Sequence, residues 1–176
     1  MRILNRIPSL QAISGIFGLI SLLVYGWSMY WFVWYFPSWI SYLTIGEILT
    51  TFYYTMAVNF AESLAVLLFL LLVCIILPSN WMRDEFQFKG GMMVLYFLSF
   101  GMTLLGNFIP LEQLARRLIF AIVLFFPVLI ILKKVRILQT ILTALVDRSV
   151  VFLYLTLPIS VIALIVIVFR NIIYVP

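Results

Sequence analysis

Residues 56–70 read MAVNFAESLAVLLFL and lie within a longer apolar stretch, from about residue 55 to residue 77. An apolar run of about 20 residues is long enough to cross the hydrocarbon core of a bilayer as an α-helix. The one ionisable side chain of residues 56–70, Glu62, is unfavourable in lipid and calls for a partner, a water-filled cavity or a function. The stretch therefore predicts a transmembrane helix that carries a polar feature.

The composition extends this conclusion to the whole chain. Of its 176 residues, 66% are hydrophobic and only 10% are charged, and the mean hydropathy is +1.24. A soluble domain has roughly a quarter charged and about half apolar residues. We therefore expect an all-α integral membrane protein in which residues 1–176 form a single transmembrane helical domain.

Further apolar stretches predict a bundle of about five transmembrane helices. The expected spans are about residues 13–36, 55–77, 90–109, 117–133 and 149–169. Pro37 is expected to end the first span, so that residues 38–54 form a short segment along the membrane interface. Residues 137–146, before the last span, are mildly amphipathic. Because 117–133 is short for a full crossing, a re-entrant segment is the alternative there.

The basic residues predict the orientation. With the N-terminus in the cytoplasm, eight Lys and Arg residues fall on the cytoplasmic side and three on the far side, as the positive-inside rule requires. We expect a multi-pass protein of a bacterial-type plasma membrane. The net charge of +5 comes from basic residues at the ends of apolar segments, where they anchor and orient the helices. Nucleic acid is therefore not an expected partner.

The missing residue types exclude several classes of chemistry. The chain has no histidine and a single cysteine, Cys74, inside an apolar run. This excludes histidine-ligated haem, thiolate zinc and iron–sulfur sites, and histidine-based catalytic triads. We expect no cofactor, no metal and no catalytic residue.

A polar stripe is the main candidate for function. Thr51, Thr55, Asn59 and Glu62 recur at intervals of four, four and three, which places them on one helix face. A carboxylate near the membrane centre is typical of a proton or cation site. Two structural alternatives are a pairing of Glu62 with arginines that enter from the same side, and a neutral Glu62 bonded to Asn59 or a carbonyl. The predicted intramembrane polar cluster is Glu62, Asn59, Thr55, Arg116 and Arg117.

Small residues predict two helix-packing faces. They recur every three or four residues and let helix backbones approach closely. Such faces serve packing within the chain or docking of another subunit. The predicted faces are Ser14, Gly18 and Ser21 in the first span, and Thr156, Ser160 and Ala163 in the last.

Three functions follow from these features. The first is a non-catalytic structural or accessory subunit of a larger membrane complex, with membrane lipid and other membrane-protein subunits as partners. The second is a small transporter or proton- or cation-conducting protein that uses Glu62 and Asn59. The third is an enzyme acting on a lipid-linked substrate through Glu62 or the Arg116–Arg117 pair. We expect the first.

Overall fold

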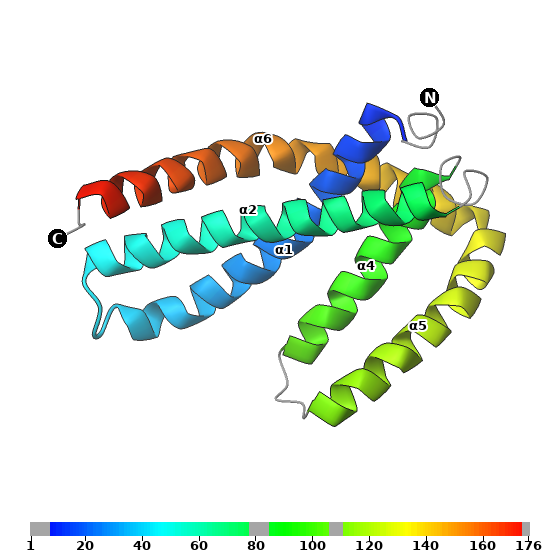
Figure 1. The fold of residues 1–176 in the computed structure, drawn as a ribbon, viewed down its shortest axis with the longest axis horizontal. Helices are drawn as coiled ribbons and strands as arrows, with labels where there is room; N and C mark the ends of the chain where they lie inside the picture. The colour runs from blue at the N-terminus through cyan, green and yellow to red at the C-terminus, as the bar shows by residue number, and fades with distance from the viewer. Residues whose placement is uncertain (1–7, 78–84, 106–110, 174–176) are drawn as a thin grey trace.

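The computed structural model describes residues 8–77, 85–105 and 111–173, and these residues form five α-helices and no strand. The all-α prediction is therefore confirmed for the described part of the chain. The helices, shown in Figure 1, are α1 (Leu10–Trp39), α2 (Ile45–Ile76), α4 (Phe86–Leu105), α5 (Leu111–Lys134) and α6 (Arg136–Ile173).

The helices are arranged as a three-helix body and a diverging pair. In the body, α1 packs most extensively on α6 and next on α2, and α2 also packs on α6. Helices α4 and α5 form an antiparallel pair that leans away from α2 (Figure 1). The pair joins the body through contacts of α4 with α1 and α6, and of α5 with α6. The first turn of α1 and the last turn of α6 lie at opposite ends of the molecule.

The connection between α1 and α2 differs from the expected interfacial segment. Pro37 lies inside α1, which ends at Trp39, and α2 begins at Ile45. Pro37 lies in the last turn of α1, and the loss of its single backbone N–H donor there did not end the helix earlier. Only residues 40–44 connect the two helices, and the predicted separate segment over 38–54 is wrong.

The start of α2 has a specific local cause. Thr44 Oγ1 accepts a hydrogen bond from the Glu47 backbone N–H (3.4 Å), and Glu47 Oε2 accepts one from the Thr44 N–H (2.7 Å). This is a capping box, in which a threonine and a glutamate three residues later satisfy each other's free backbone donors. The Thr-x-x-Glu spacing was the sequence signal that would have placed the helix start correctly.

The last two predicted pieces form one helix. Residues 137–146 and the span 149–169 both belong to α6, which continues through Pro158. The amphipathic residues 137–146 are therefore the first part of the same helix as the predicted last span. One uninterrupted buried stripe, with a residue every three or four positions, holds the two parts together as a single helix. Its members are Leu142, Val146, Ser149, Leu153, Thr156, Ser160 and Ala163.

Four of the described helices are long and apolar enough to cross a membrane. They are α1, α2, the part Gln113–Leu132 of α5 and the part Arg136–Arg170 of α6. Helix α5 is continuous over 24 residues, or about 36 Å at 1.5 Å per residue, which is enough for a full crossing. A crossing by α4 stays a prediction, and residues 106–109 of that predicted span lie outside the described residues.

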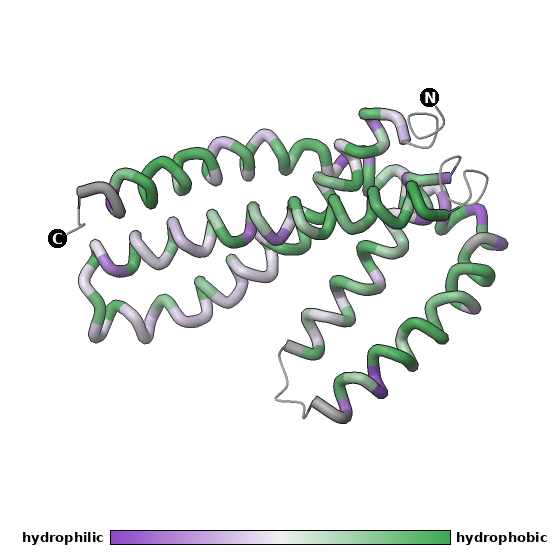
Figure 2. Tube along the Cα trace, in the orientation of Figure 1, coloured by the Kyte–Doolittle hydropathy of each residue, from purple (hydrophilic) through white to green (hydrophobic). Residues whose placement is uncertain are grey.

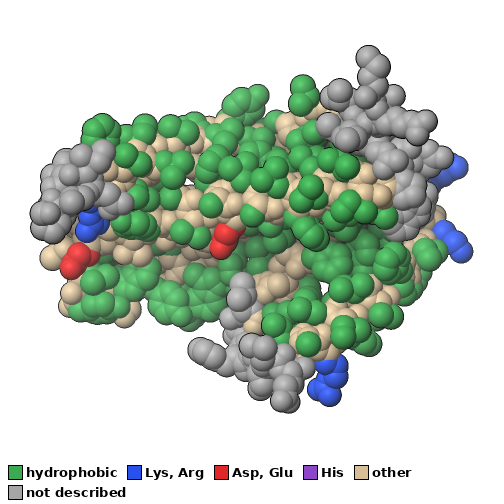
Figure 3. Space-filling view, viewed as in Figure 1, with side chains coloured by type: hydrophobic (Ala, Val, Ile, Leu, Met, Phe, Trp, Pro, Cys, Tyr) green, Lys and Arg blue, Asp and Glu red, His purple; other side chains and the backbone are tan. Residues whose placement is uncertain are grey.

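Apolar side chains dominate the surface. Hydropathy is high along α5 and α6 and lower where α1 and α2 are joined (Figure 2). The face in Figure 3 is mainly hydrophobic, with a few scattered charged groups. Such a surface requires lipid or protein around it, and the protein is a helical protein suited to membrane insertion.

Candidate functional site

Buried polar side chains meet where α1, α2 and α6 come together. Tyr25 on α1 is hydrogen-bonded through its hydroxyl to Ser160 Oγ on α6, and the same hydroxyl lies 3.4 Å from the Met56 carbonyl oxygen on α2. Ser160 is fully buried and donates its own hydrogen bond to the Thr156 carbonyl. The Tyr25 hydroxyl of α1 thus contacts polar atoms of both α2 and α6, in a region where each polar group needs a partner.

A second polar contact lies one turn further along α1. Ser28 Oγ donates a hydrogen bond to Asn59 Oδ1 (2.8 Å), and Asn59 is only 2% exposed. The Asn59 Nδ2 atom and the Ser63 Oγ atom, one helical turn apart on α2, are buried without a hydrogen-bond partner among the described residues. Asn59 therefore serves the contact between α1 and α2, with donor capacity left over.

The Ser28–Asn59 hydrogen bond has a measurable strength. Interhelical hydrogen bonds in membranes couple helices by about 0.6 kcal/mol on average and at most about 1.7 kcal/mol. We expect a double-mutant cycle with Ser28→Ala and Asn59→Ala to give a coupling free energy in this range when unfolding is measured in mixed micelles. The control cycle pairs Ser28→Ala with Thr55→Ala, since the Thr55 hydroxyl donates to the Thr51 carbonyl of its own helix. Equal coupling in the two cycles would contradict the contact.

Thr55 lies beside an aromatic cavity. The cavity is about 250 Å³ in volume. Along α1, the rings of Trp31 and Tyr35 stack at 5.7 Å between centroids, and those of Tyr35 and Trp39 at 6.0 Å. Amphipathic rings of this kind are typical of a membrane–water interface. The lining residues are Trp27, Ser28, Trp31, Phe32, Tyr35, Trp39 and Thr55.

Within the predicted polar cluster, Glu62 and Asn59 have different surroundings. Glu62 is exposed, whereas Asn59, three residues earlier, is buried. Arg116 and Arg117 are also exposed, on α5. Within the described residues, no hydrogen bond or ion pair joins Glu62 to either arginine or to any other group.

On α2, Glu62 lies one helical turn before an apolar groove that is lined by α2, α4 and α5. On α2, Glu62 precedes the groove residues Val66, Phe69 and Val73 by 4, 7 and 11 positions, which places them all on one face. A cavity of about 630 Å³ forms the first part of the groove. A second cavity, of about 540 Å³, shares Val73 with the first and continues to Leu77. The first cavity is lined by Ala65, Val66, Phe69, Leu70, Val73, Met93, Val94, Phe97, Leu98, Leu118 and Ile122.

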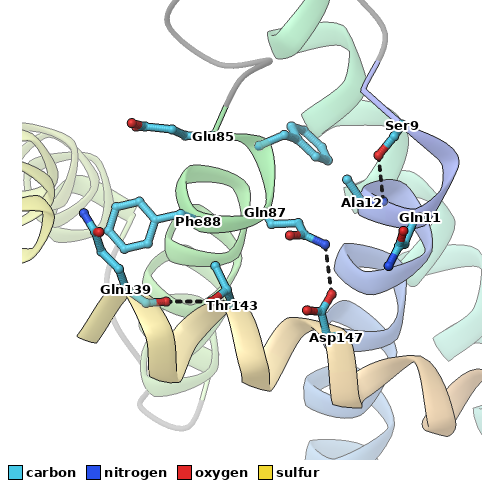
Figure 4. Close-up of a pocket in the computed structure, with 10 residues that line it drawn as sticks. Ser9, Gln11, Ala12, Glu85, Gln87, Phe88, Gln139, Thr143 and Asp147 are labelled. Carbon is cyan, nitrogen blue, oxygen red and sulfur yellow. Dashed lines mark hydrogen bonds between the residues drawn. The ribbon is translucent and has the colours of Figure 1, made fainter. Parts of the chain in front are cut away.

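A polar pocket of about 480 Å³ lies between the starts of α1 and α4 and the first half of α6 (Figure 4). Gln87 Nε2 donates a hydrogen bond to Asp147 Oδ1 (2.9 Å) across it. Nearby on α4, the buried Lys89 forms an ion pair with Glu85 (3.1 Å). Sequence reasoning missed this pocket because its polar residues come from three distant segments. They are Ser9, Gln11, Glu85, Gln87, Gln139, Thr143 and Asp147.

The small residues of the predicted packing faces lie mainly inside the chain's own bundle. Gly18, Ser21, Thr156, Ser160 and Ala163 are all buried, whereas Ser14 is half-buried and bonds the Gln11 carbonyl. A Cβ atom on Gly18 would overlap the Ser149 backbone oxygen of α6. These positions therefore serve the close approach of α1 and α6.

Comparison of the chain with protein-family models, with curated proteins and with solved structures finds no match in any of the three.

Proposed function

We propose that this protein is a non-catalytic accessory subunit of a larger membrane complex. The observation that carries the proposal is the exposure of Glu62 on the apolar groove face of α2. An acidic side chain facing lipid near the middle of a helix disfavours insertion by about 2.5–3.5 kcal/mol. Coverage of that face by another protein chain would remove the penalty.

The arrangement of the polar side chains supports a structural role over transport. Tyr25, Ser28, Asn59 and Ser160 form hydrogen bonds between helices of the body. Glu62 is exposed instead. A transport site built on Glu62 and Asn59 would therefore need one exposed and one buried side chain to act together. The proposal also keeps the expected setting, a bacterial-type plasma membrane with the N-terminus in the cytoplasm. The opposite positions of the start of α1 and the end of α6 favour an odd number of crossings.

Extraction from native membranes tests the proposal. We expect the tagged chain, extracted as polymer-bounded native nanodiscs, to carry a larger membrane protein at a fixed stoichiometry. We expect Glu62→Gln to reduce the recovered partner, because the isosteric amide removes the charge and keeps the size. Recovery of the chain alone or as a homo-oligomer, together with cation or proton flux in liposomes that Glu62→Gln abolishes, would instead establish the transport function.

A further inference from the structure

The groove beside Glu62 is long enough to follow most of a bilayer crossing. From Glu62 to Leu77 the α2 wall covers 15 residue steps, or about 22 Å at 1.5 Å per residue. The hydrocarbon core is about 30 Å thick, so one leaflet supplies about 15 Å. A lipid tail stays within one leaflet, whereas a transmembrane helix follows the groove along its whole length. The dimensions favour a helix.

The described residues of the groove walls bring no cation to Glu62. On α5, the groove is lined by Leu118 and Ile122. Successive residues of a helix are rotated by about 100°, so Arg117 lies about a quarter turn from Leu118, and Arg116 lies on the opposite side of the helix. All other described groove residues are apolar. Among the described residues, the Glu62 carboxylate therefore has no cationic partner, and it lies one helical turn before the apolar groove.

We propose, on the basis of the accessory-subunit function above, that the groove binds one transmembrane helix of a partner protein and that this helix carries a Lys or Arg side chain opposite Glu62. The apolar walls on α2, α4 and α5 hold the body of the helix. The cation and the Glu62 carboxylate form an ion pair at one depth in the membrane, so that neither charge is left unpaired in lipid. Pairing of this kind is how ionisable groups are tolerated within a membrane. Charge complementarity also sets the register of the bound helix.

The test uses a defined peptide instead of an unidentified protein. The probe is a synthetic Leu/Ala transmembrane helix with a single Lys about one third along its length, and its matched versions carry Leu or Glu at that position. The full chain is labelled at Ile119→Cys, an exposed α5 position, and is reconstituted in phosphatidylcholine vesicles, where energy transfer reports binding. We expect the wild-type chain to bind the Lys peptide about ten-fold more tightly than the Leu peptide.

A charge swap and a steric block supply the controls. We expect Glu62→Gln to abolish the preference and Glu62→Lys to bind the Glu peptide in place of the Lys peptide. Ala65→Trp fills the groove and should prevent binding. Leu68→Trp places the same indole ring at an exposed position, two residues and about 200° beyond Val66, and should not prevent binding.

Three results would overturn the inference. They are equal affinity of the wild-type chain for the Lys and Leu peptides, equal binding by the two Trp variants, and energy transfer between two labelled copies that Ala65→Trp removes. The last result would assign the groove to a second copy of this chain. If a partner co-extracts at fixed stoichiometry while the peptides bind indifferently, the groove inference fails and the subunit function stands. If no partner co-extracts, the subunit function fails.

Discussion

Gly18→Ala should lower the free energy of unfolding by about 3 kcal/mol, at the upper end of the range for overpacking a close contact. The added Cβ atom would overlap the Ser149 carbonyl oxygen and would lie 2.8 Å from the Val150 nitrogen. These are backbone atoms of α6, so no side-chain rotation relieves the overlap and the two helices must separate. Because α1 and α6 form the most extensive helix contact, the whole three-helix body is weakened.

The matched control is Gly26→Ala in the same helix. No atom lies within 4 Å of a Cβ atom at Gly26, and alanine favours a helix over glycine by up to about 1 kcal/mol. We therefore expect a neutral or slightly stabilising effect. Unfolding titrations in mixed micelles of increasing SDS fraction measure both variants. Equal stability of the two would mean that α1 and α6 do not touch at Gly18.

Phe86→Ala should destabilise the protein by about 3 kcal/mol or more, as expected for removing a buried aromatic ring. Phe86 is 2% exposed at the start of α4, and both its ring and the Ile16 side chain lie against Gly90. Helix α4 is the element through which the α4–α5 pair contacts α1. Loss of the ring should therefore loosen the pair from the body and widen the groove.

Phe120→Ala is the control for this prediction. Phe120 lies on α5 of the same pair, but its side chain is 65% exposed, so its removal should change stability by less than about 0.5 kcal/mol. The same titration measures stability, and spin labels at exposed positions on α2 and α5 measure the groove width. A groove of unchanged width in a destabilised Phe86→Ala chain would show that other contacts hold the α4–α5 pair.

The polar cluster illustrates what spacing predicts and where it stops. The intervals between Thr55, Asn59 and Glu62 predicted one shared face. The face is broad, however. Asn59 is buried against α1, whereas Glu62, three residues later, is exposed. The direction in which each side chain faces depends on where the neighbouring helices lie. That information comes from α1, α4 and α5, not from α2.

The amino-acid sequence by itself determined the helical, membrane-compatible character of this protein, because hydropathy and helix formation depend on residues close together in the chain. It also contained the small-residue spacing on α1 and α6. The Thr44–Glu47 spacing, which starts α2 through a capping box, was present in the sequence as well. Only the tertiary structure decided that Gly18 meets Ser149, that Ser28 meets Asn59, and that Glu62 lies one helical turn before an open apolar groove. Those outcomes depend on packing between segments separated by tens of residues, and lipid offers every helix a competing apolar neighbour.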